Sequence, residues 1–145
     1  MPGYGHKALA YALLRMTVGL MFFVFGVSKF LRGLDTVALG MQSRMAEAPM
    51  PEFLVGAFAR VLPFGEVAIG LLLMVGLFTR GALVAAALLM MALTVGVVLE
   101  PSPATVAANV NYALIIVALL WLSEYDGYSV DHLRDRRSAS GGNKP

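Results

Sequence analysis

Cysteine is absent from this sequence of 145 residues. Its absence excludes disulfides, thiol redox chemistry, and zinc or iron–sulfur centres held by cysteine within the chain. Histidine is almost as scarce, since His6 and His132 lie near opposite ends and outside the long apolar segments. A haem held at membrane depth by two histidines therefore has no ligands here. We expect no metal and no covalent cofactor, so electrons that pass through this protein need a partner or a bound organic molecule.

Charged residues are also few. They make up 14% of the chain, against 59% hydrophobic residues, whereas about 25% of the residues in a soluble domain are charged. The mean hydropathy is +0.76. Although the pI is near 9.2, the net charge is only +2 and the basic residues are scattered. The composition excludes nucleic acid as a partner and predicts a protein surrounded by membrane lipids.

Four apolar segments are long enough to cross a bilayer, because about 20 apolar residues at roughly 1.5 Å per residue span its hydrocarbon core. Between the first two segments, apolar residues recur at helical spacing over 33–51, which predicts a short amphipathic helix in the membrane interface. The sequence therefore predicts an all-α integral membrane four-helix bundle over residues 1–131, followed by a polar, disordered cytoplasmic tail at 132–145. The four segments cover residues 8–31, 53–78, 81–99 and 105–123.

The basic residues predict the orientation. An even number of spans places both termini on one side, and lysine and arginine are more frequent on the cytoplasmic side. The side with the termini has seven of them: Lys7, Arg15, Arg80, Arg134, Arg136, Arg137 and Lys144. The opposite side has four: Lys29, Arg32, Arg44 and Arg60. Both termini are therefore expected in the cytoplasm.

Glu66 lies inside the second apolar segment, where a carboxylate is costly unless it is neutral, paired or hydrated. An ion pair with Lys29 or Arg60 would satisfy it. The functional alternative is that Glu66 exchanges a proton or hydrogen-bonds the head group of a bound molecule. Arg15 and Lys29 lie near opposite ends of the first segment, so the simplest expectation for each is that it extends toward lipid phosphates.

The fourth segment has a polar face. Asn109 and Tyr112 are three residues apart and could offer two hydrogen-bonding groups to a ligand, or could bond to other helices instead. Small residues allow helix backbones to approach closely in lipid. The glycines expected at such helix contacts are Gly19, Gly26, Gly70 and Gly76.

The polar residues of the spans would suit a molecule with a polar head and an apolar body. A quinone fits that description, because its ring and tail need apolar walls and its carbonyl oxygens need donors. The pattern allows a quinone without requiring one, and it assigns no catalytic residue. The five candidates are Arg15, Lys29, Glu66, Asn109 and Tyr112.

Several short runs resemble the DoxX family of four-helix bacterial and archaeal membrane proteins. They are RMTVGLMFFVFGVSK at 15–29, EVAIGLLLMVGLFTR at 66–80, Asn111-Tyr112, and YSVD at 128–131. The resemblance covers residues 9–131 and implies a four-helix bundle in the inner membrane of a prokaryote. It also implies a link to a quinone-dependent membrane complex. One position departs from the family pattern, since Phe25 stands where many members have a histidine. The positions that match the family are Arg15, Gly19, Gly26, Lys29, Glu66, Gly70, Gly76, Arg80 and Tyr112.

The sequence therefore predicts a small integral membrane subunit of a quinone-linked respiratory or redox assembly. It would act as an accessory or quinone-adjacent anchor without a metal or thiol redox centre of its own. Its expected partners are lipids, a larger membrane protein complex and a quinone. The alternative is a permease or small-solute carrier in which Glu66 and Lys29 line a polar path.

Overall fold

The computed structural model describes residues 2–46, 49–99 and 103–131. Within them there is no strand, and four of the helices (α1, α3, α4 and α5) are long and apolar enough to cross a membrane. The predicted all-α membrane four-helix bundle is confirmed. The tail predicted at 132–145 lies outside the described residues. The elements are α1 (Pro2–Arg32), α2 (Leu34–Arg44), α3 (Glu52–Val75), α4 (Thr79–Leu99), α5 (Pro103–Trp121) and the 3₁₀ helix η1 (Leu122–Tyr125).

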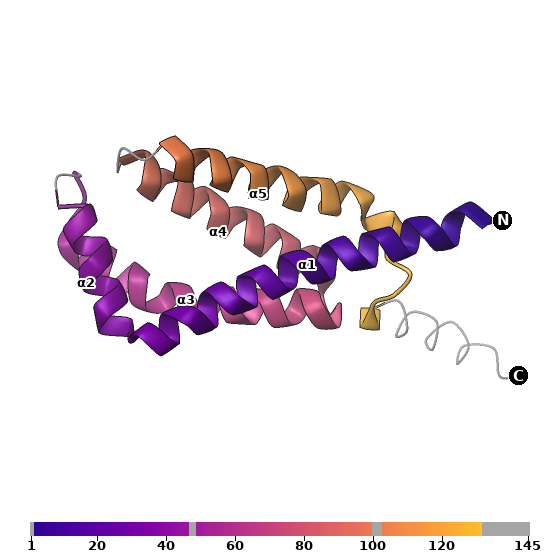
Figure 1. Cartoon of the computed structure of the whole chain (residues 1–145), viewed down its shortest axis with the longest axis horizontal. Coiled ribbons are helices and arrows are strands. Elements are labelled where there is room, and N and C mark those ends of the chain that lie inside the picture. Colours follow the sequence, from indigo (N-terminus) through magenta and orange to yellow (C-terminus); the bar gives the residue numbers. More distant parts are fainter. Residues whose placement is uncertain (1, 47–48, 100–102, 132–145) are drawn as a thin grey trace, which may run out of the picture.

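The spans pack in two main pairs, α1 with α3 and α4 with α5, while α3 also contacts α4 (Figure 1). The start of α1 and η1 lie at one end of the bundle, which we call the η1 end. The helix α2 lies at the opposite end, the α2 end, beside the last turns of α4. The expected amphipathic helix thus lies opposite the start of the chain. Which end faces the cytoplasm stays a prediction.

Backbone contact joins α1 to α3, because glycines occupy the crossing. A Cβ on Gly70 would lie 2.5 Å from the backbone nitrogen of Phe23, and a Cβ on Gly19 would lie 3.0 Å from the carbonyl oxygen of Gly70. A Cβ on Gly26 would lie 2.9 Å from the carbonyl oxygen of Pro63. Small residues promote helix association in lipid through close packing. These glycines therefore set the distance between α1 and α3.

Apolar side chains from all four spans fill the centre of the bundle. Outward-facing leucines such as Leu13, Leu88 and Leu114 stay exposed, as expected where acyl chains take the place of water. The bundle thus buries a tight core and presents an apolar outer surface. The central cluster consists of Tyr11, Val18, Phe22, Ile69, Leu73, Ala82, Leu83, Ala86, Met90, Ile116 and Leu119.

The turn between α3 and α4 differs from the expectation. The apolar pattern predicts a span that continues to residue 78 and a turn at Thr79 and Arg80, but α3 ends at Val75 and both of those residues lie in α4. Gly76 explains the early end, because its φ of 73° places it in the left-handed region that commonly terminates helices. Gly76 is therefore a helix cap at the η1 end, and it also packs closely, since a Cβ there would lie 2.6 Å from Nη1 of Arg15 on α1.

A carboxylate that is distant in sequence caps the start of α4. Asp131 accepts hydrogen bonds from the backbone N–H groups of Phe78 and Thr79, at 3.0 and 2.9 Å. Its own N–H donates to the carbonyl oxygen of Gly76 at 3.2 Å. The first N–H groups of a helix have no partner within the helix and favour an acidic cap. The segment after η1 therefore completes the α3–α4 turn.

The helix α2 folds back onto α3. Gly33, with a φ of 86°, separates it from α1, and Ala38 is fully buried. Gln42 donates from Nε2 to the carbonyl oxygen of Glu52 at 2.9 Å. Together these contacts fix α2 across the end of the spans.

Candidate functional site

Lys29 and Glu66 form an ion pair between α1 and α3. The Lys29 ammonium donates to both carboxylate oxygens of Glu66, at 2.6 Å to Oε2, and Oε1 is the second acceptor. The Glu66 side chain is 3% exposed and the Lys29 side chain 24% exposed. Glu66 thus has the first of its two expected partners. Lys29 does not extend to lipid phosphates.

Arg60, the other expected partner of Glu66, bonds elsewhere. Its Nε and Nη2 atoms donate to Oδ1 of Asp35 at 3.1 and 2.9 Å. Both side chains are well exposed, at 50% and 83%. The Arg60–Asp35 pair lies on the exposed surface of the bundle and joins α3 to α2. It therefore leaves Lys29 as the cation of Glu66.

Arg15 is buried, so the expectation that it extends to lipid phosphates is wrong. Its side chain is 2% exposed, and Nη1 donates to Oδ1 of Asp126 at 2.8 Å. Nη2 donates to the carbonyl oxygen of Tyr128 at 2.9 Å. The physical reason is that the chain after η1 packs against α1, which places the Asp126 carboxylate and the Tyr128 carbonyl next to Arg15. Arg15 therefore ties the first helix to the segment after the last one.

Buried polar atoms without partners surround this pair. The hydroxyl groups of Tyr11 and Thr79 and the Nε atom of Arg15 have no hydrogen-bond partner among the described residues. All three residues are at most 3% exposed. Buried groups of this kind usually bind ordered water. The η1 end thus contains buried polar atoms beside the apolar cluster to which Tyr11 belongs.

Asn109 and Tyr112 lie on α5 and do not join either ion pair. Asn109 is 9% exposed, and its Nδ2 has no hydrogen-bond partner within the described part of the chain. Tyr112 is partly buried against the central apolar cluster. For Asn109 Nδ2, the alternative of a bond to another helix is not realised. This amide is thus a buried donor on α5 without a partner among the described residues.

The five candidate residues therefore do not form one hydrogen-bonded group. Arg15 is at the η1 end, Lys29 and Glu66 are toward the α2 end, and Asn109 and Tyr112 are on α5. Sequence reasoning missed Asp126 as the partner of Arg15, since 111 residues separate the two. In the described ranges, no three His, Cys, Asp or Glu side chains are grouped as they would be around a metal ion.

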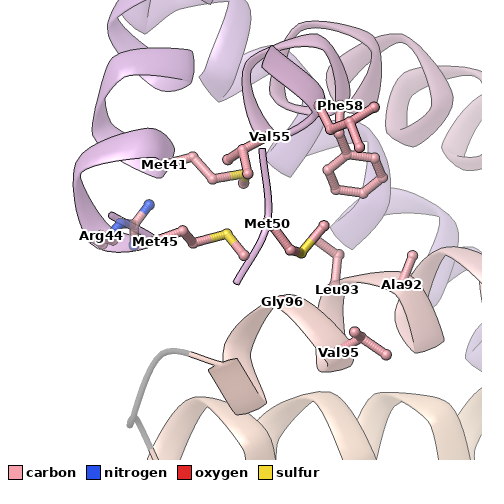
Figure 2. A pocket seen from close by; sticks show the side chains of 11 residues that line it. Met41, Arg44, Met45, Met50, Val55, Phe58, Ala92, Leu93, Val95 and Gly96 are labelled. Atoms are coloured by element: carbon pink, nitrogen blue, oxygen red, sulfur yellow. The ribbon is translucent and has the colours of Figure 1, made fainter. Parts of the chain in front are cut away.

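A cavity of about 480 Å³ lies at the α2 end, among α2, α3 and α4. Figure 2 shows the side chains of Met41, Met45 and Met50 directed into it, with Phe58 on the opposite wall. Among the described residues that line it, Arg44 is the one with a charge. Sequence patterns do not predict this cavity, because it depends on how α2 folds over α3 and α4.

The comparisons with known proteins identify one family. The family model described as methylamine utilisation protein MauE matches residues 7–108, which is more than half of the chain. No curated protein and no solved structure matches the chain significantly. The resemblance to DoxX is thereby overturned, because the matching model belongs to a different membrane family.

Proposed function

Since the chain belongs to the MauE family, named for methylamine utilisation, we propose that it is a small accessory subunit of a redox-linked methylamine-utilisation system. It would lie in the inner membrane of a prokaryote, as a multi-pass protein beside a larger partner. The chain has no cysteine, so thiol redox chemistry would belong to that partner. Its own contribution would be a rigid, lipid-embedded anchor.

The observation that supports an accessory role is that the buried cation Arg15 and the partly buried cation Lys29 are both paired within the chain. Lys29 is held by Glu66, and Arg15 by Asp126. Breaking such pairs leaves an uncompensated buried charge, so paired groups resist serving as mobile carriers of protons or solutes. The solute-carrier alternative requires Glu66 to release Lys29, and neither carboxylate oxygen is free. The geometry therefore favours a structural role for these ion pairs over a role in solute transport.

We further propose that a quinone binds to this subunit. It would bind at the interface between this chain and its partner, since the five polar candidates do not form one hydrogen-bonded group. We assign this contact to Asn109, whose Nδ2 is a buried donor without a partner among the described residues, so a quinone head group would insert against α5 to reach it. A quinone carbonyl oxygen is a suitable acceptor for this amide.

Deletion in the native host tests the accessory role. Membranes from the deletion strain should lose most of their methylamine-dependent electron transfer to the quinone pool, followed by absorbance, and the wild-type gene should restore it. Gentle solubilisation should recover the chain in a complex well above its own 15.5 kDa. Unchanged electron transfer, or recovery of the chain only with copies of itself, would refute the proposal.

A pair of asparagine variants tests the quinone contact. Asn109→Leu should slow quinone reduction without changing the amount of complex. The matched control is Asn111→Leu, because Asn111 lies on the same helix and is exposed. Equal rates in the two variants would remove Asn109 from the quinone proposal while leaving the accessory role intact.

A further inference from the structure

The cavity at the α2 end has the character of a lipid site. Its volume of about 480 Å³ falls within the range of roughly 300–1,000 Å³ typical of small-molecule sites. Apart from Arg44, the described residues that line it are apolar, with methionines from α2 and the following segment and Phe58 from α3. Methionine side chains are flexible and adapt to irregular apolar ligands. Such walls suit a hydrocarbon chain.

Arg44 supplies the polar end of this site. It lies in the last turn of α2 and is exposed. Its Nε atom donates to the carbonyl oxygen of Gly40 at 3.1 Å, while its two terminal nitrogens have no hydrogen-bond partner among the described residues. A guanidinium with free terminal nitrogens can bind a phosphate through two parallel hydrogen bonds. An anionic head group is therefore the complement of this rim.

The position of the cavity matches the depth of a lipid. Leu54 and Phe58 line it from the first turns of α3, and Leu93 and Gly96 line it from late turns of α4. The cavity thus lies just inside one end of the spans, with α2 across its mouth (Figure 2). Chains that enter from this end would leave their head group near Arg44.

From these observations we propose that the cavity binds one acidic phospholipid, with an acyl chain between α2, α3 and α4 and its phosphate on Arg44. The inference does not depend on the redox role. It assigns α2 a function, because α2 provides Met41 and the cation, while the segment after it provides Met45 and Met50. The head-group charge distinguishes this lipid from a neutral lipid or a quinone, because Arg44 would contribute less binding free energy to an uncharged ligand.

Gly96 provides a way to close the cavity. A Cβ at this position would lie 3.9 Å from the Cε atom of Met45, which is ordinary contact. Gly96→Ala should therefore keep the cavity open, whereas Gly96→Phe should fill it. Gly65→Phe is the matched control, because nothing lies within 4 Å of its Cβ position and Gly65 does not line the cavity.

Native mass spectrometry of the purified full chain tests the proposal, with phosphatidylglycerol and phosphatidylcholine of identical acyl chains supplied in equal amounts. We expect one retained lipid per chain and about fivefold preference for phosphatidylglycerol, the gain typical of one basic side chain near an anionic lipid. Arg44→Gln should abolish the preference, while Arg32→Gln, an exposed arginine outside the cavity, should keep it. Gly96→Phe should lose the retained lipid, while Gly65→Phe and Gly96→Ala should retain it.

Three results would overturn the proposal. The first is equal retention of the two lipids by the wild-type chain. The second is an unchanged preference in Arg44→Gln, which also decides the matter if Gly96→Phe fails to fold. The third is displacement of phosphatidylglycerol by an equimolar quinone, which would transfer the cavity to the quinone. Loss of methylamine-dependent electron transfer in the deletion strain would be unaffected by any of these results.

Discussion

Removing either member of the Lys29–Glu66 pair should destabilise the bundle unequally. Lys29→Met leaves Glu66, whose side chain is 3% exposed, without its cation, and stranding a buried charge in this way costs about 3–5 kcal/mol. Glu66→Leu leaves Lys29, which is 24% exposed and can move its ammonium toward the head groups, at a cost of about 1–3 kcal/mol. The lysine variant should be the less stable of the two.

The double variant Lys29→Met/Glu66→Leu should recover most of the loss. Replacing a whole buried pair by apolar side chains is often nearly neutral, so we expect a cost within about 2 kcal/mol of wild type. The coupling energy should therefore be at least about 2 kcal/mol. Reversible unfolding in mixed detergent and dodecyl sulfate, followed by far-UV circular dichroism, measures all four free energies.

The exposed pair Arg60–Asp35 is the matched control. Because these side chains are 50% and 83% exposed, Arg60→Gln with Asp35→Asn should cost less than about 1 kcal/mol. The reasoning fails if the Lys29 and Glu66 single losses add up to the double loss. It also fails if Glu66→Leu is costlier than Lys29→Met.

Three further outcomes follow from the packing. Gly70→Ala should weaken thermal stability in detergent, because its Cβ would lie 2.5 Å from the backbone of α1, whereas Gly65→Ala, with open space around it, should be neutral or slightly stabilising. Asp131→Ala should cost about 1 kcal/mol and increase hydrogen exchange at the start of α4, while Asp35→Ala should leave that exchange unchanged. Leu88→Lys should impair insertion of α4 by roughly 3 kcal/mol, measured by glycosylation of an inserted acceptor site, and unchanged insertion would argue against this span.

The spans and the Lys29–Glu66 pair were accessible from sequence because hydrocarbon imposes a strong rule on charge. Glu66 sits among apolar residues and needs a cation, and few cations lie at its depth. The length of an apolar run likewise predicts a span. These features depend on local composition and on the solvent, so a single sequence contains them.

The partner of Arg15 was not accessible in the same way. Asp126 lies 111 residues further along in a segment without helical periodicity, and only the folded chain brings it under α1. The predicted end of α3 was too late for a related reason. Gly76 and the carboxylate of Asp131 define the turn after Val75, whereas the apolar residues that follow make the span look longer in the sequence. The cavity depends on the placement of α2, which short-range patterns do not determine.

The family was also misassigned from short motifs. Arginine, lysine and glycine at the positions of Arg15, Lys29, Gly19 and Gly26 serve to hold a small helical bundle together in lipid. Such motifs describe an architecture that different membrane families can share. A family model that spans residues 7–108 compares many positions at once and therefore distinguishes membrane families that share these motifs.

The contact between Arg15 and Asp126 has a consequence for biogenesis. The ribosome adds Arg15 to the chain 111 residues before Asp126, whose carboxylate neutralises it in the folded bundle. Every insertion intermediate up to that moment holds an uncompensated cation near the η1 end, which must stay hydrated or bind a lipid phosphate. Closure of the bundle is therefore tied to late translation, when Asp126 withdraws the guanidinium from the membrane surface.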